Sequence, residues 1–203
     1  MTRTFLRAAV LIVAMVWGAV ASAQTAGRDG PLKAGAYALD ASRTHIGFSL
    51  MRLGFAYYSG TFSDASGSLR IDPAKPTETT LQVTMPVASL ATGNGAVDAD
   101  LKGPNWFDAA RYPTATFIST VVTATGPDTA DITGILTLHG VTQAEILQVH
   151  YLDAAADPIA KPGEAGFEAA TTIKRSDFGL SAFFPVIGDD VRLTITGVFV
   201  ARR

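Results

Sequence analysis

The residue types that most often perform chemistry in proteins are few in this chain and widely separated. Its three histidines, His45, His139 and His150, fall in different segments and show none of the short spacings typical of zinc ligands. There is no cysteine, which excludes thiol catalysis and cysteine-ligated metals. No G-x-S-x-G nucleophile motif occurs, and residues 93–95 (GNG) lack the third glycine of a phosphate-binding loop. The sequence therefore predicts neither a metal site nor a catalytic residue.

One charged pair is a candidate for polar recognition. Arg175 and Asp177 are two residues apart, so they point to the same side if both belong to a continuing strand. Such a pair can close one end of a fold as a buried ion pair, or it can contact the head of a ligand. We keep both interpretations and name Arg175 and Asp177 as head-group candidates.

Residues 1–23 have the layout of a secretory signal peptide. Two arginines precede the uncharged apolar run Ala8–Val20, and small residues at 21–23 suit cleavage. The run has 13 residues, fewer than the roughly 20 that a membrane-spanning helix needs; a retained membrane anchor is the alternative. We therefore expect export to the periplasm, a flexible segment at 24–36 and a single domain at 37–203.

The composition after cleavage narrows the class of protein. Removing residues 1–23 leaves 14 basic and 18 acidic residues, a formal charge of −4. A mildly acidic chain of this kind gives no reason to expect nucleic acid as a partner. Without cysteine an exported protein has no disulfides, so burial alone must hold the fold together, which a domain of this size can achieve.

The elements that must position any site are mostly β-strands. Leu81, Val83, Met85 and Val87 alternate with smaller or polar residues, which is the pattern of a half-buried strand. Segments of this kind predict eight strands: 44–53, 59–71 (with a break near 64–67), 81–87, 114–124, 131–139, 141–153, 167–175 and 191–199. Most of the connections are too short for parallel crossovers, so we expect an antiparallel sheet.

Two connections have a recognisable character. His139 and Gly140 separate two apolar strands and predict the centre of a tight hairpin. Residues 89–113 form a connection too long for a bare loop in a compact domain. We expect it to hold a short helix near 98–107 that caps one end of the fold, between the third and fourth strands.

Eight antiparallel strands can form a sandwich or close into a barrel, and closure leaves no exposed edges. The interior of an eight-stranded barrel either packs solid or holds one small ligand. Eleven phenylalanines, 19 glycines and a mean hydropathy of +0.25 favour a cavity, with a solid core as the alternative. An outer-membrane barrel is a second alternative, but the strands lack flanking aromatic girdles and the chain ends in two arginines.

Six motifs occur in order between residues 37 and 199. They are YALD (37–40) with THIGF (44–48), RLGF (52–55) with GTF (60–62), DL (100–101) with WFD (106–108), YPTATF (112–117), GILTLHGVT (134–142) and KRSDFG (174–179). Together they resemble the YceI family of periplasmic lipocalin-like proteins, which is also called the polyisoprenoid-binding family.

The resemblance implies a lipocalin-like, eight-stranded antiparallel barrel around an apolar pore. It implies an apolar lipid partner (a polyisoprenoid, a quinone tail or a similar amphiphile) and no cofactor other than such a bound lipid. Arg175 and Asp177 would then face a pyrophosphate or quinone head. The family's Arg-Asp-x-His-Leu run is replaced here by Val97–Leu101, so its arginine and histidine are absent.

We expect apolar residues from the strands and the capping helix to form the ligand-binding wall. They are Phe48, Leu50, Leu53, Phe55, Phe62, Met85, Leu101, Trp106, Phe107, Phe117, Phe178 and Phe183. Ordinary core packing is the alternative for each of them.

Three functions fit these features. The first is a non-catalytic binding or carrier protein, the second a stress or interaction protein with an incidental cavity, and the third an enzyme acting on a lipid or quinone. A solid interior would favour the second, and a strongly perturbed titratable group inside the pore the third. A homodimer, and transient contact with a membrane or a lipid-handling membrane protein, remain open.

Overall fold

The computed structural model describes residues 32–156 and 163–202, and strands make up most of them. The strands are β1 (Gly35–Leu39), β2 (His45–Arg52), β3 (Ala56–Phe62), β4 (Ser66–Ile71), β5 (Thr80–Pro86), β6 (Thr114–Ala124), β7 (Thr129–Leu138), β8 (Val141–Ala156), β9 (Gly163–Lys174) and β10 (Ile187–Ala201). The α-helix is α1 (Gly95–Lys102), and the 3-10 helices are η1 (Ala41–Arg43), η2 (Pro76–Glu78), η3 (Val87–Ser89) and η4 (Arg175–Phe178).

The N-terminal expectations concern residues that the structure mostly does not describe. The predicted signal peptide, 1–23, and residues 24–31 of the predicted flexible segment lie outside the described residues, so both stay predictions. Within the described part of the chain, β1 already begins at Gly35. No helix of that part is long and apolar enough to cross a membrane.

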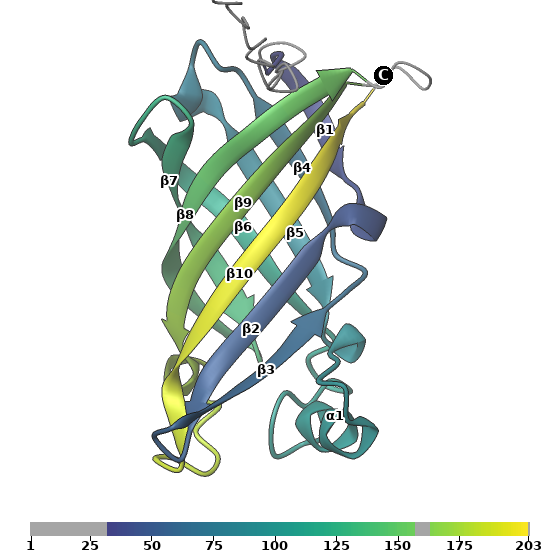
Figure 1. Cartoon of the computed structure of the whole chain (residues 1–203), viewed down its shortest axis with the longest axis vertical. Coiled ribbons are helices and arrows are strands. Elements are labelled where there is room, and N and C mark those ends of the chain that lie inside the picture. Colours follow the sequence, from purple (N-terminus) through teal and green to yellow (C-terminus); the bar gives the residue numbers. More distant parts are fainter. Residues whose placement is uncertain (1–31, 157–162, 203) are drawn as a thin grey trace, which may run out of the picture.

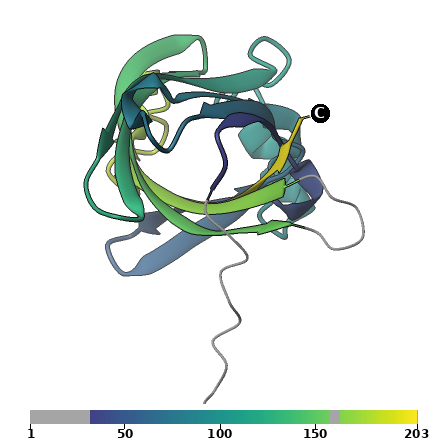
Figure 2. The same cartoon turned by 90° about the horizontal axis from the view of Figure 1, so that it is seen from above.

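The strands form one antiparallel sheet that closes on itself (Figures 1 and 2). The order is β1-β4-β5-β6-β7-β8-β9-β10-β2-β3, and pairing of β1 with β10 completes the ring. Both β1 and β2 pair with β10, one on each side of η1, so together they occupy the place of one broken strand. Likewise β4 pairs with β1 and β3 pairs with β2, so β3 and β4 together occupy the place of a second broken strand. The structure thus confirms an eight-stranded antiparallel barrel.

The position of the helix corrects the sequence prediction. The helix lies in the connection where we expected it, but this connection follows the fifth strand, β5, and not the third, because two more strands precede it than predicted. The strand β1 was missed, and the break expected near 64–67 divides segment 59–71 into two strands, β3 and β4, near Asp64, whose φ is 59°. The helix also begins and ends earlier than 98–107: the Asn94 side chain caps its first turn by accepting from two backbone N–H groups, and Gly103 follows its last residue.

The barrel is fully paired in its upper half and split in its lower half (Figure 1). β8 pairs with β9 only from Gln148 onward. In the gap below, Gln143 Nε2 donates to the backbone oxygen of Asp177 in η4 at 3.0 Å. On the other side β3 does not pair with β5, and a bridge between Thr61 and Ala91 ties the segment after β5 to β3. Connecting segments therefore close the lower half.

The lower half is filled by the protein's own side chains, which we call the closed-end core. Its buried members are Ile46, Phe48, Phe62, Ala65, Leu90, Leu101, Trp106, Ala115, Leu138, Ile173, Phe178, Leu180 and Val191. The Phe62 ring lies 5.5 Å from that of Phe48 and 6.0 Å from that of Phe107 between centroids, within the range of favourable aromatic pairs. Burial of these side chains seals this end of the barrel.

The hairpin between β7 and β8 confirms its sequence prediction. Two residues, His139 and Gly140, join the strands, with φ values of 51° and 75°. Positive φ at both central residues is what a type I′ turn requires, and this turn matches the twist of the paired strands. The His139 ring lies 4.7 Å from that of Tyr112, and its Nδ1 is 3.1 Å from the backbone oxygen of Phe178. These contacts give His139 a structural role at the closed end.

Replacing Gly134 with alanine should destabilise the barrel by about 1–3 kcal/mol. An added Cβ would lie 2.7 Å from the backbone oxygen of Ile118 and would collide with the Phe117 ring, which lies over this glycine. The matched control is Gly95→Ala, because nothing lies within 4 Å of a Cβ at that position of α1. Chemical denaturation measures both variants. Equal stability of the two would contradict the close packing of Phe117 on β7.

Candidate ligand cavity

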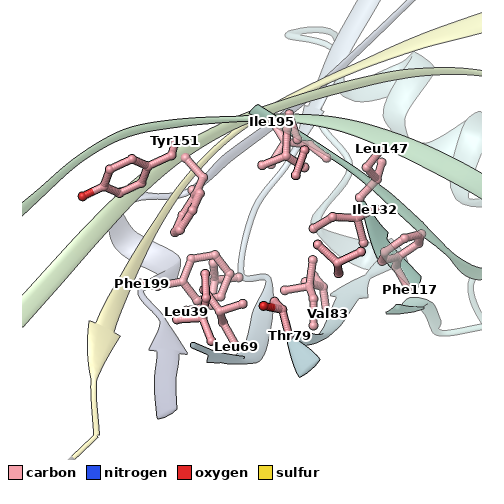
Figure 3. Close-up of a pocket in the computed structure, with 18 of the residues that line it drawn as sticks. Leu39, Leu69, Thr79, Val83, Phe117, Ile132, Leu147, Tyr151, Ile195 and Phe199 are labelled. Atoms are coloured by element: carbon pink, nitrogen blue, oxygen red, sulfur yellow. The ribbon is translucent and has the colours of Figure 1, made fainter. Parts of the chain in front are cut away.

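The upper half of the barrel encloses a cavity of about 760 Å³, to which every strand contributes (Figure 3). It reaches the rim of the barrel, where the turns at 72–76 and 126–129 border it. At its lower end it is bordered by Ile46, Phe62 and Ala115, which belong to the closed-end core. The cavity is therefore a tube that is blocked at one end. Its volume lies within the range of about 300–1,000 Å³ that is typical of small-molecule sites.

The wall of the cavity is almost entirely apolar because of the alternation within the strands. On β7 and β8 the inward residues Ile132, Leu136, Leu147 and Val149 line it, whereas Ile146 and Gln148, which alternate with those of β8, are exposed. Figure 3 labels apolar wall residues from seven strands: Leu39, Leu69, Val83, Phe117, Ile132, Leu147, Ile195 and Phe199. Such a surface favours hydrocarbon over water.

Carboxylates on the wall lie near its two ends. Asp72 and Asp128 lie in the rim turns, whereas Glu145 lines the lower part of the cavity from β8. Burial, and to a lesser extent the negative charge of Asp177, raise the pKa of Glu145 above its ordinary value. The other polar side chains among the described lining residues are threonines and Tyr151.

Arg175 and Asp177 do not form the pair that the sequence suggested, and neither lines the cavity. The strand β9 ends at Lys174, and both residues lie in η4 at the closed end. Arg175 is buried and donates to the backbone oxygens of Leu180, Ile187 and Gly188; the last two of these bonds are each 2.8 Å long.

The surroundings of Arg175 are structural. Its guanidinium carbon lies 5.8 Å from the centre of the Trp106 ring, a cation–π contact. Burial lowers the pKa of Arg175 from its ordinary value. The structure thus corrects the head-group assignment: Arg175 holds together the loop before β10 at the end of the barrel opposite the rim.

Three of the predicted wall residues lie on the cavity wall. Phe62, Met85 and Phe117 line its lower part from β3, β5 and β6. Their contact with a ligand stays a prediction.

Six predicted wall residues belong instead to the closed-end core or pack against it. They are Phe48, Leu50, Leu101, Trp106, Phe107 and Phe178. The alternation of β2 places Phe48 inward as expected, but at a level of the barrel that is filled by side chains. Phe178 has no exposed surface at all, so it has no access to a ligand in this structure. For these residues core packing is the correct interpretation.

The last three predicted wall residues are exposed at the lower tip of the barrel. Leu53 and Phe55 lie in the turn between β2 and β3, where Leu53 has a φ of 56°, and they are 52% and 79% exposed. Phe183 is 68% exposed and stacks on Trp106 with ring centroids 6.0 Å apart. A turn, not a continuing strand, separates these side chains from the interior.

Most of the wall was missed by sequence reasoning. Inward residues such as Ile132, Leu147, Leu193 and Ile195 carry no family motif, so they were not selected. The signal that could have found them is the alternation itself, applied to every predicted strand. The carboxylate of Glu145 was missed for the same reason.

The fold and the cavity define a class: an eight-stranded antiparallel barrel with an apolar internal pocket open at one end. Within that class, the model of the YceI-like domain matches residues 37–199. The chain belongs to this family. A UPF0312 protein of Pseudomonas syringae pv. tomato is 35% identical over 172 residues, covering 83% of this chain and 89% of that protein. A UPF0312 protein of Azotobacter vinelandii is 34% identical over 169 residues, covering 82% and 88%.

Solved structures show the same fold. Burkholderia cenocepacia BcnA superposes with a TM-score of 0.71 at 26% identity, covering 79% of this chain and 98% of that one. The Campylobacter jejuni YceI protein gives a TM-score of 0.68 at 29% identity, covering 76% and 91%. A polyisoprenoid-binding domain from Saccharophagus degradans gives 0.65 at 21% identity, covering 84% and 100%, and shares the fold.

Proposed function

We propose that the protein binds and carries a long apolar lipid, a polyisoprenoid, a quinone tail or a similar amphiphile, without performing chemistry on it. The observation that carries the proposal is the one-ended apolar tube of about 760 Å³. A hydrocarbon chain inside it leaves water, while a charged or bulky head stays hydrated at the rim near Asp72 and Asp128.

The energetics of such a tube favour tails over compact ligands. Each buried methylene contributes about 0.8 kcal/mol, so a five-carbon unit gains roughly 4 kcal/mol before ordering costs are subtracted. Because this gain depends on area and hardly on chemical detail, related tails should compete for the same cavity.

The isoprenoid class is supported by the motif run that resembles the polyisoprenoid-binding family and by the match to the YceI-like domain. The S. degradans domain is described as binding polyisoprenoid, but its likeness to this chain extends to the fold alone. The ligand class therefore depends mainly on family membership, and the tail preference on the cavity.

We further propose that the protein works in the periplasm after removal of residues 1–23, which have the layout of a signal peptide. A carrier is useful in that compartment because an isoprenoid tail cannot cross water unshielded. The carrier would then load and unload by transient contact of its rim with a membrane or a lipid-handling membrane protein.

The alternative function, an enzyme, has one observation in its favour, the raised pKa of Glu145. Absence of any change in a bound lipid after prolonged incubation would exclude it.

Affinity should rise with tail length and then level off. At roughly 30 Å³ per water-sized group, a cavity of about 760 Å³ holds roughly 25 such groups, or about five five-carbon units. Longer tails would extend beyond the rim and gain little. Competition among polyprenols of increasing length against a fluorescent tail measures this. An affinity that rises without limit, or that is greatest for a single isoprene unit, would contradict the tube.

A further inference from the structure

Glu145 is the carboxylate that a strand places on the cavity wall; the other two on that wall, Asp72 and Asp128, belong to rim turns. It shares the inward face of β8 with Val141, which packs against the closed-end core, and with Leu147, which lines the cavity. Glu145 lies between them along the strand. Its side chain therefore meets the cavity near its floor. The leading end of a chain that fills the cavity would lie next to it.

The surroundings of Glu145 offer its carboxylate little compensation. On the β7 side it is paired with Gly134, over which the Phe117 ring lies. On the other side, the pairing of β8 with β9 begins only at Gln148. Within residues 32–156 and 163–202, the half-buried side chain of Glu145 has no hydrogen bond and no ion pair. The charge that acts on it is that of Asp177, which has the same sign and, together with burial, raises the pKa of Glu145.

We propose that Glu145 makes the floor of the cavity a hydrogen-bond acceptor that selects chains whose leading end is a hydrogen-bond donor. An alcohol, a primary amide or an amine belongs to this class. The inference rests on the proposed lipid-binding function and specifies the ligand class of the same cavity.

The physical reason is the exclusion of water by the ligand. In the empty cavity water can hydrate the carboxylate, but an apolar chain that fills the tube displaces it. A carboxylate left without a partner in an apolar site is strongly unfavourable, whereas a donor at the end of the chain restores one hydrogen bond. A phosphate or carboxylate end would instead add a third negative charge beside Glu145 and Asp177. A quinone head, which only accepts hydrogen bonds, would remain at the rim.

The test compares probes that share one tail and differ at one end. They are geranylgeraniol, its methyl ether, geranylgeranyl amine and geranylgeranoic acid, each titrated against the full barrel at neutral pH. The wild type should bind the alcohol and the amine at least about tenfold more tightly than the methyl ether and the acid, since sites built around a buried acceptor reject ligands that lack the donor. Glu145→Leu should abolish this preference and bind the ether best. Glu145→Gln should keep part of the preference for the alcohol.

A surface carboxylate supplies the control. Glu168→Leu, at an exposed position of β9, should leave the order of the four probes unchanged. The inference is overturned if the wild type binds the alcohol and the ether equally, or if Glu145→Leu retains the preference. In both cases binding itself would persist and the proposed function would stand. Failure of the wild type to bind any of the four probes would overturn the lipid-binding function along with it.

Discussion

Replacing Leu147 with aspartate is expected to weaken the uptake of a polyprenol by at least about 100-fold while the barrel stays folded. Leu147 lies on the cavity wall and is 9% exposed. The open tube lets water reach the new carboxylate when the cavity is empty, so the folded state tolerates it. A bound tail must displace that water and leave the charge without a partner, which opposes binding.

The neighbouring residue provides a matched control for this substitution. Gln148 follows Leu147 on β8, points outward and is exposed. Gln148→Asp introduces the same carboxylate one residue away and should leave uptake within about threefold of the wild type. Native mass spectrometry after incubation with polyprenol measures uptake, and circular dichroism monitors the fold. Undiminished uptake by Leu147→Asp would show that the tail binds elsewhere.

Replacing Arg175 with alanine is expected to cost about 3–5 kcal/mol of folding free energy. The substitution removes a buried guanidinium and leaves the backbone oxygens of Leu180, Ile187 and Gly188 without their donor. Arg175→Lys should lose less stability, because the ammonium keeps the charge. It should still lose some, since an ammonium cannot reach three oxygens as the planar guanidinium does. Arg192→Ala, at an exposed position of β10, should change stability by less than about 0.5 kcal/mol.

The same variant separates the two roles considered for Arg175. Because the residue lies at the closed end, folded Arg175→Ala should take up polyprenol as the wild type does. Urea denaturation gives the stability and a binding titration below the transition gives the uptake. Normal stability with lost uptake would restore a head-group role and contradict the structural one.

The barrel could be predicted from the sequence because its signals are local. The alternation in 81–87 and the His139–Gly140 turn each specify a conformation within a few residues. The strand β1 escaped detection since it is only five residues long and Tyr37 is its one buried residue. The prediction for Arg175 and Asp177 failed because it assumed a continuing strand, whereas the chain turns into η4 and leaves it through Gly179 at a φ of 75°.

The location of the cavity along the barrel could not be predicted in this way. Alternation tells that Phe48 and Phe117 both point inward, but not that Phe48 lies in the filled half and Phe117 at the border of the hollow half. That difference depends on the stagger of strands far apart in sequence and on which loops fold beneath them. The aromatic residues of the family motifs proved mostly to build the closed end, whereas most of the wall consists of residues outside the motifs, such as Ile132 and Leu147.

The most direct test of the central claim is to purify the protein from the cells that make it and to identify by native mass spectrometry and solvent extraction what it retains. The account predicts one long-chain apolar lipid per protein molecule, released by solvent and lost in Leu147→Asp. Wild-type protein that is consistently empty, and that takes up no polyprenol when it is supplied, would contradict it.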